Sequence, residues 1–275
     1  MNLYSKISKI IINITFFSFL LCISEPLSDY KKNKVYQIQK IENNINPPLV
    51  DGFLNDSIWT NIPIIEDFIQ KDPYHNMLPT YKTEIKLLYD EENIYLHAKL
   101  YHDNPKDIAQ HLCRRDEWMQ CFEKTSDWFS FDIDPLHSHN SGYIFAINAA
   151  GVQVDALVVD DRDYDAEWNG IWFSDVSITN DGWSIKMKIP FSNLNYNSEI
   201  NSTWGLNFSR YTKSLDEESS WIVIPRHLDG IASKFGHLTD IYLNKNDKSI
   251  QVRPYFSGGV DNINNIELAE EYKIE

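Results

Sequence analysis

The stretch "IWFSDVSITNDGWSIKMKIP" (171–190) decides the fold class, because it contains two strands and the turn that joins them. From Trp183 to Ile189, apolar side chains alternate with Ser184, Lys186 and Lys188. This period of two predicts a strand with its apolar side chains buried and the other three facing solvent. "NDG" (180–182) stands between the two strands and is a strong hairpin signal, because Asn and Gly tolerate positive φ.

The same period recurs from about residue 35 to residue 243. "KTEIKLLYD" (82–90) joins "IYLHAKLYHD" (94–103) in a second hairpin, and only "PKDIAQHL" (105–112) has a helical pattern. Further strands are expected at 127–134, 142–149, 151–159, 203–212, 219–224 and 236–243. Ten or so short strands, each buried on one face, predict an all-β fold, an antiparallel two-sheet β-sandwich. The core residues expected are Phe145, Ile147, Trp172, Trp183, Ile185 and Met187.

The two ends of the chain indicate export and a second region. Residues 1–24 are expected to be a signal peptide, because two lysines precede an apolar run, Ile10 to Leu21, that is too short to span a membrane. Residues 25–34 are expected to form a flexible leader and residues 35–243 the sandwich. "SIQVRPYFSGGV" (249–260) starts a new strand with nothing downstream to pair with. Residues 249–275 are therefore expected to be the start of a further region that is truncated here.

The charge balance argues against nucleic acid as a partner. The chain carries 25 Lys and Arg against 40 Asp and Glu, a net charge of −15. A surface with this excess of carboxylates repels phosphate backbones. No catalytic motif stands out either, neither a nucleophile elbow, nor a zinc-binding His pair, nor a phosphate-binding loop. Enzymatic activity therefore has no positive support, except as a module attached to a glycoside hydrolase.

Two cysteines, Cys113 and Cys121, remain after the signal peptide. An exported chain lies where disulfides persist, so the two either pair across a short loop or stay as two buried thiols. The sequence leaves both possibilities open.

The stretch "DDRDYDAEWNGIW" (160–172) is the one candidate metal loop. Asp161, Asp163 and Asp165 have the alternate spacing of calcium ligands, although the full twelve-residue calcium loop fails at Ala166 and Trp172. The sequence thus predicts Ca²⁺ as a possible cofactor, with a solvated acidic loop as the alternative. Trp172 is expected in the core, because it lies at the start of a strand.

A series of motifs carries a resemblance to a known family. In order they are "PPLVDGFLNDSIW" (47–59), "YDEENIYLHAKLYHDNP" (89–105), "SDWFSFDID" (126–134), "GYIFAINAAGVQVDA" (142–156), "WNGIW" (168–172), "DGWSIKMKIPFSNL" (181–194), "WGLNFSR" (204–210) and "SKFGHL" (233–238). Together they resemble a family 9 carbohydrate-binding module, a calcium-associated β-sandwich. "CRRDEWM" (113–119) and "VRPYFSGGV" (252–260) further resemble outer-membrane-associated bacterial proteins in which such a domain precedes a C-terminal β-barrel.

The resemblance implies a sugar site, but this chain departs from it at four positions. Sugar-binding members hold a sugar end between two tryptophans, with a glutamate and an arginine nearby. Here the corresponding neighbourhoods offer Lys124, Asp229, Ser130 and Ala146. Other groups can rebuild a pocket through ring stacking and hydrogen bonds to hydroxyls. The residues predicted for this role are Trp118, Trp168, Asn169, Arg114, Phe122 and Asp116. For the charged residues 114–116, a salt-bridged loop is the alternative.

The functional prediction combines the resemblance with the missing catalytic motifs. We expect an exported, non-catalytic domain that binds polysaccharide or oligosaccharide, in the periplasm or outer membrane of a Gram-negative bacterium. It would be part of a larger outer-membrane protein with a C-terminal β-barrel. The rival interpretation is an interaction or gating domain for that barrel without sugar affinity, and a third is an accessory module of a glycoside hydrolase.

Overall fold

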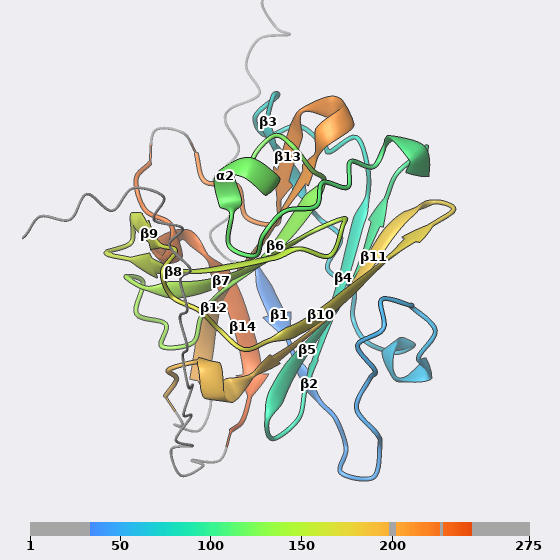
Figure 1. The fold of residues 1–275 in the computed structure, drawn as a ribbon. Helices are drawn as coiled ribbons and strands as arrows, with labels where there is room; N and C mark the ends of the chain where they lie inside the picture. Colours follow the sequence, from blue (N-terminus) through green and yellow to red (C-terminus); the bar gives the residue numbers. More distant parts are fainter. Residues whose placement is uncertain (1–33, 198–201, 226–227, 244–275) are drawn as a thin grey trace, which may run out of the picture. The chain divides into compact units, whose positions relative to one another are not determined.

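Two β-sheets pack face to face in the computed structural model, which describes residues 34–197, 202–225 and 228–243 (Figure 1). The chain divides into two units, Met1–Lys245 and Asn246–Glu275, and every described residue belongs to the first. The expected signal peptide (1–24), nearly all of the leader (25–34) and the expected start of a barrel (249–275) lie outside the described residues. Within the described part, no helix combines the length and the apolar character needed to cross a bilayer.

Sheet A has nine strands. Its main path follows the order β1-β14-β12-β6-β7-β8-β9, and β13 pairs with both β12 and β3. In that order the bounds are β1 Val35–Gln37, β14 Gly236–Ile241, β12 Ser202–Thr212, β6 Trp128–Asp134, β7 Gly142–Asn148, β8 Gln153–Val159 and β9 Asp163–Asp165, with β13 at Glu217–Ser220 and β3 at Ile69–Asp72.

Sheet B has five strands in the order β10-β11-β5-β4-β2. Their bounds are β10 Phe173–Thr179, β11 Gly182–Pro190, β5 Asn93–Tyr101, β4 Thr83–Tyr89 and β2 Gln39–Lys40. All pairings in the two sheets are antiparallel except β1 with β14 and β2 with β4, which are short and parallel. The predicted all-β two-sheet sandwich is confirmed, with these two pairings as additions.

The core lies between the two sheets and contains the six residues that the sequence predicted. Phe145, Ile147, Trp172, Trp183, Ile185 and Met187 are all buried in one continuous apolar cluster. The hairpin at 180–182 is also confirmed, because Thr179 pairs with Gly182 across a two-residue turn. Gly182 has a φ of 140°, and a Cβ atom there would lie 2.0 Å from the Leu100 carbonyl oxygen, so the first position of β11 requires glycine.

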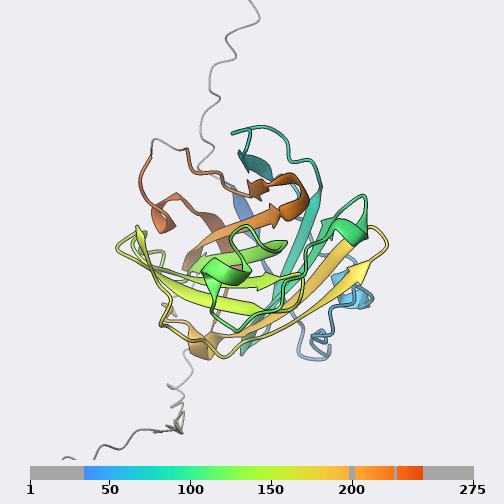
Figure 2. The ribbon, with the colours of Figure 1, turned by 45° about the horizontal axis from the view of Figure 1, so that its top comes forward.

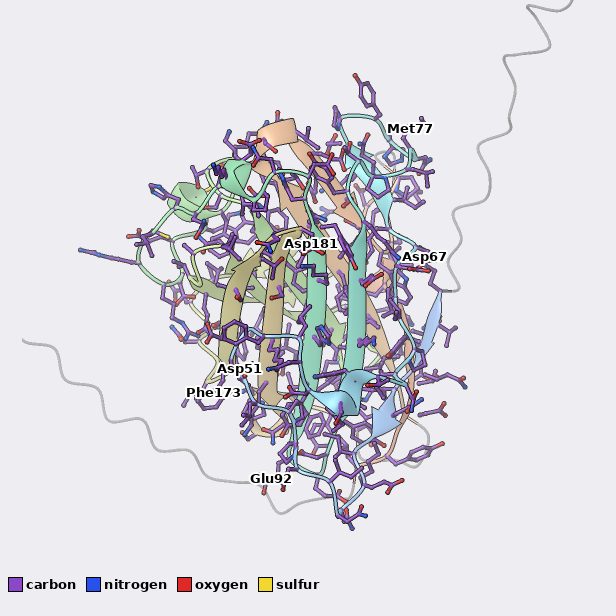
Figure 3. All side chains as sticks on the ribbon, turned by 90° about the vertical axis from the view of Figure 1, so that its right-hand side faces the viewer. Asp51, Asp67, Met77, Glu92, Phe173 and Asp181 are labelled. Atoms are coloured by element: carbon purple, nitrogen blue, oxygen red, sulfur yellow. The ribbon has the colours of Figure 1, made fainter. Side chains whose placement is uncertain are left out.

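The outer face of sheet B is covered, which corrects the prediction that Ser184 and Lys186 face solvent. The covering segment, residues 41–62, packs Ile41, Trp59 and Ile62 against Leu88 and Tyr95 of the sheet. Figure 3 looks at this side of the molecule, with Asp51 of the segment labelled. The expected alternation is present, but the face that should meet water meets this segment instead.

Polar contacts attach the covering segment to β11. The Lys186 ammonium lies 2.8 Å from an Asp51 carboxylate oxygen and 2.5 Å from one of Asp56, and its side chain is almost fully buried. The Ser184 hydroxyl donates to the Gly52 carbonyl oxygen at 2.6 Å. A Cβ atom on Gly52 would approach the Val176 backbone to 2.8 Å, so glycine permits this close contact.

Local structure differs from the sequence prediction in a few other places. The helix expected at 105–112 is only one 3-10 turn, Pro105–Asp107, after which Ile108 is extended. A four-residue helix that the sequence did not predict, α2 (Trp118–Cys121), lies in the loop before β6. The short strands β1, β2, β3 and β9 were also missed, and the strand expected at 219–224 is β13, Glu217–Ser220. These strands have only two to four residues, too few to show a period.

Candidate functional site

A groove with a volume of about 510 Å³ lies on the outer face of sheet A. Alternation along β6 creates its floor, because Phe129, Phe131 and Ile133 point into the core and Ser130 and Asp132 point the other way. Figure 2 shows the strands of sheet A with α2 beside them. The groove is lined mainly by Lys71, Trp118, Lys124, Trp128, Ser130, Asp132, Val154, Ala156, Tyr164, Asn207, Ser209, Tyr211, Glu218 and Ser220.

Three aromatic rings form one end of the groove. The Trp118 ring lies 5.4 Å from that of Trp128, which lies 5.9 Å from that of Tyr211. The polar tips of two rings are already used: the Trp128 indole donates to the Glu123 carbonyl oxygen, and the Tyr211 hydroxyl donates to Asp216. Phe122 is fully buried and stacks on Trp118 at 5.2 Å, so the Trp118 ring is supported from one side.

A carboxyl group with one unpartnered oxygen lies on the groove floor. Asp132 is only 8% exposed, and its Oδ1 atom has no hydrogen-bond partner among the described residues. Burial raises the pKa of Asp132 to about 7, and the charge of Glu218 adds to the rise, whereas a hydrogen bond from Ser130 and the charge of Lys71 oppose it. A buried polar atom that lacks a partner is costly to a fold, and a ligand hydroxyl in the groove would satisfy it.

The remaining charges around the groove are mostly neutralised in pairs. Lys71 lies 2.8 Å from Glu218, and Lys124 lies 3.5 Å from Asp216. The hydroxyls of Ser209 and Ser220 hydrogen-bond to each other at 2.9 Å. The groove thus offers stacking surfaces and hydrogen-bonding groups suited to binding.

The structure separates the six residues predicted as a sugar site. Trp118 lines the groove and Phe122 supports it, whereas Arg114 is exposed on the preceding loop. Asp116 accepts hydrogen bonds from the Asn169 side chain at 3.2 Å and from the Asp155 backbone at 3.2 Å. The predicted set is therefore not one pocket, and its sugar-binding role stays a prediction.

A buried carboxylate, Asp155, organises the loops that carry the other predicted residues. It accepts from the Arg115 guanidinium, from the Trp172 indole at 2.8 Å and from the Gly170 backbone at 2.8 Å. Arg115 also donates to the Gly170 carbonyl oxygen at 2.9 Å. This network matches the alternative given for residues 114–116, a salt-bridged loop, and Arg115 is its cation.

Trp168 packs into the protein. Its ring makes edge contacts with Tyr143 at 5.2 Å and with Phe145 at 5.9 Å. A Cβ atom on Gly170 would lie 2.8 Å from the Trp168 ring, which shows how closely the ring covers that backbone. Trp168 is not part of the groove lining.

The three aspartates predicted as calcium ligands do not converge. Asp161 Oδ1 accepts from the backbone amides of Ile231 and Ser233 at 2.8 and 2.9 Å, whereas Asp163 and Asp165 are exposed on β9. Burial raises the pKa of Asp161, but the hydrogen bonds from Ser233 and Ile231 outweigh it, so the net shift is downward. In the described part of the chain, no three His, Cys, Asp or Glu side chains are placed to hold a metal ion as they stand. These residues do not fit a calcium ion, and calcium binding stays an untested prediction.

Cys113 lies on the loop between the Asp155 network and the groove. It packs against the cluster of Phe122, Trp128 and Tyr211 and is disulfide-bonded, which excludes a free thiol at this position. The side chain of Cys121 lies outside the described residues.

The sequence missed Trp128, Asp132 and Tyr211 as site residues. All three lie in strands that were correctly predicted, at alternate positions that point away from the core. The available signal was the alternation of apolar and polar residues in β6, where Phe129 and Phe131 alternate with Ser130 and Asp132. It indicates that the polar pair points away from the core. The resemblance pointed to the same region. Of the four positions where this chain differs from sugar-binding members of the family, Ser130 and Lys124 line the groove. A third, Ala146, pairs with Ser130 across β6 and β7.

Comparisons with known proteins support the fold. No protein-family model and no curated protein matches the sequence. Among solved structures, a family 9 carbohydrate-binding module from Caldicellulosiruptor kristjanssonii in complex with cellotriose is 14% identical, with a TM-score of 0.51 over 80% of this chain and all of that one. The same kind of module in complex with glucose is also 14% identical, with a TM-score of 0.54 over 78% and 100% of the two chains.

A third solved structure, a Bacteroides uniformis protein provisionally named as carbohydrate-binding, is 17% identical, with a TM-score of 0.55 over 75% of this chain and 98% of that one. At these identities the likeness shows a shared fold. The resemblance to the family 9 fold, which the sequence motifs indicated, is confirmed at that level.

Proposed function

We propose that this chain is a carbohydrate-binding domain and that the groove on the outer face of sheet A is its binding site. The observation that carries the proposal is the combination, in one groove, of three aromatic rings with the unpartnered Oδ1 atom of Asp132. Sugar rings present C–H faces that stack on aromatic side chains and hydroxyls that need hydrogen-bond partners. The groove supplies both kinds of contact.

Each group has a separate role in this proposal. Trp118 supplies the main stacking face, because Phe122 holds its ring from behind. Asp132 accepts a hydrogen bond from a sugar hydroxyl when ionised, and it donates one when protonated. Lys71 and Glu218, at the rim of the groove, offer further hydrogen bonds.

The solved relatives lend support from the fold. Two of them hold cellotriose or glucose, and they share this sandwich over most of its length. We extend the proposal to a non-catalytic domain that is exported to the periplasm or outer membrane and is attached to a C-terminal β-barrel. The apolar run at 10–21 and the strand pattern at 249–260 motivate this extension.

The test is isothermal titration of the full chain against cellulose, xylan and mannan oligosaccharides at pH 8, where Asp132 is ionised. We expect Trp118→Ala to weaken binding several-fold to about tenfold, because a stacked aromatic contributes ~0.5–1.5 kcal/mol beyond its burial. Asp132→Asn should weaken it by a similar factor. Phe173→Ala is the matched control, because Phe173 is a half-exposed aromatic residue on β10 of sheet B, away from the groove.

The same titrations compare the groove with the site predicted from sequence. Trp168→Ala removes a ring packed on Tyr143 and Phe145, so we expect it to lower the melting temperature and leave the affinity unchanged. Affinity lost in Trp168→Ala and kept in Trp118→Ala would move the site to the 168–172 loop. No heat with any glycan, at concentrations that detect millimolar affinity, would favour an interaction domain without sugar affinity.

A further inference from the structure

The polar groups next to Asp132 on the groove floor are engaged elsewhere. Across β6 and β12, Asp132 pairs with Asn207, and both polar atoms of the Asn207 side chain bond to the Ile222 backbone, at 3.2 and 2.8 Å. Across β6 and β7 it pairs with Ile144, whose side chain has no polar atom. Ser130 donates one hydrogen bond to the carboxyl group. The Oδ1 atom has no partner among the described residues, so a donor for it has to come with the ligand.

Carboxyl groups outnumber ammonium groups in the part of the groove lining that the structure describes. Glu123, Asp132 and Glu218 contribute carboxyl groups, and Lys71 and Lys124 contribute ammonium groups. Both lysines already pair with carboxylates: Lys71 lies 2.8 Å from Glu218, and Lys124 lies 3.5 Å from an aspartate outside the lining. The groove therefore favours a cationic ligand over an anionic one.

An ammonium group satisfies the free oxygen of Asp132 better than a hydroxyl group does. A hydrogen bond between ionised groups is shorter and roughly twice as strong as one between neutral groups. A buried carboxylate also costs free energy unless a cation compensates it, and the lysines of the lining are bound to other carboxylates. Among sugars, those in which an amine replaces a ring hydroxyl carry such a cation.

We propose that the groove selects amino sugars, whose ammonium group donates to Asp132 Oδ1 while the oligosaccharide stacks on the aromatic end of the groove. This inference rests on the proposed function and adds the class of sugar to it. Neutral sugars bind more weakly, because a hydroxyl group leaves the carboxylate without a cation. Sugars that carry carboxylate or sulfate groups are rejected, because they meet the carboxyl groups of Glu123, Asp132 and Glu218.

Binding of an ammonium group should displace a proton from Asp132. Burial raises the pKa of Asp132 to about 7 against the hydrogen bond from Ser130, and the charges of Glu218 and Lys71 act in opposite directions. Tyr164 on β9 also lines the groove, and its phenol is neutral at pH 6. At pH 6 the empty groove therefore holds Asp132 largely protonated. A neighbouring cation lowers the pKa of a carboxyl group, so an amino sugar releases this proton and a neutral sugar does not.

The test compares two β-1,4-linked trisaccharides that differ only at carbon 2 of each ring: cellotriose, with a hydroxyl group, and its glucosamine counterpart, with an amine. Isothermal titration of the full chain at pH 6 measures both affinities. We expect the amino trisaccharide to bind about fivefold more tightly, and Asp132→Asn to abolish this preference. Asp175→Asn is the matched control and should keep it, because it removes one exposed carboxylate from β10 of sheet B.

Repeating the titrations in two buffers with different ionisation enthalpies counts the protons released. We expect about one proton for each amino trisaccharide bound to the parent chain, and none for cellotriose. This readout needs no variant. Release of no proton, equal or weaker binding of the amino trisaccharide, or a preference that persists in Asp132→Asn would overturn this inference and leave the proposed function standing. A galacturonic acid trisaccharide that binds as tightly as cellotriose would also overturn it, whereas no heat with any of the sugars would overturn both proposals.

Discussion

The outer faces of the two sheets differ in what lies on them. On sheet B the outer face is covered by residues 41–62, whereas on sheet A it forms an open groove. Both faces bury a charged residue, Lys186 on sheet B and Asp132 on sheet A. Lys186 contacts two carboxylates of the covering segment, but Asp132 has an oxygen with no partner among the described residues.

The difference distinguishes a structural charge from an available one. A buried charge is tolerated when charged and hydrogen-bonded partners compensate it, as for Lys186. A buried group without a partner costs free energy unless something else supplies the missing contact. The proposed function rests on Asp132 because its unsatisfied oxygen is buried on the floor of an open groove.

The largest effect is expected on the covered face. Lys186→Met leaves Asp51 and Asp56 without their cation and releases the covering segment, so we expect a loss of about 2–4 kcal/mol of unfolding free energy. The loss should fall toward the low end because both carboxylates keep some exposure to water. Urea denaturation measures it. Lys188→Met is the control, since Lys188 lies on the same strand over the Phe173 ring, and a loss of equal size there would contradict the role given to Lys186.

The second prediction concerns acid stability through His97, which lies under Trp59 on the covered face. Burial lowers the pKa of His97 to about 4, and the charges of Lys86 and Lys186 add to this. The unfolded chain takes up this proton near pH 6.5 and the folded chain does not. Stability should therefore fall as the pH drops from about 6.5 to 4, by on the order of 2 kcal/mol.

Urea midpoints measured across this pH range test the His97 prediction. His97→Gln removes the titrating group, so its stability should change less steeply with pH than that of the parent chain. An identical slope in both proteins would show that other groups govern the acid response of the covered face.

The third prediction has the opposite sign and belongs to the open groove. The pKa of Asp132 is raised to about 7, so between about pH 4 and 7 the folded chain holds a proton that the unfolded chain has lost. This contribution is present at pH 4 and is lost as the pH rises through 7, with a magnitude on the order of 1 kcal/mol because the groove is open to water. Asp132→Asn should remove it, and the difference in stability between the two proteins, followed from pH 4 to 8, measures it. A difference that does not vary with pH would mean that Asp132 titrates normally.

The two faces also differ in how much of each could be predicted from the sequence. Alternation predicted the core, the two hairpins of sheet B and the longer strands under the groove, β6, β7, β8 and β12, because apolar period and turn residues are local signals. It also predicted which side chains of β11 point away from the core, Lys186 among them. Alternation does not predict which segment covers the outer face of a sheet. Residues 41–62 have no apolar period of their own, and they contact β11 from more than a hundred residues away in the chain.

The candidate site was harder to predict for the same reason. Trp118 and Trp168 look alike in sequence, each in a polar loop, and only tertiary packing separates them: one lines the groove and the other covers Gly170. Trp128 and Asp132 belong to the motif "SDWFSFDID" (126–134), which indicates a strand and the family resemblance but no ligand role. Their second role depends on β9, β12 and β13 forming the sides of the groove, which are long-range pairings that the sequence does not encode locally.

The smallest effect is expected for calcium at the end of sheet A. Asp161 Oδ1 is already occupied by two backbone amides, and Asp165 accepts from the Glu167 amide at 3.0 Å, so little carboxylate remains to attract an ion. A site with a dissociation constant near 1 mM would add only about 0.4 kcal/mol at 1 mM Ca²⁺, a melting shift of roughly 1 °C. We therefore expect calorimetry with Ca²⁺ and with EDTA to agree within about 1 °C. A larger rise with Ca²⁺ that disappears in Asp163→Asn would instead establish the predicted calcium site, and it would show that ligand binding rearranges the 160–165 loop.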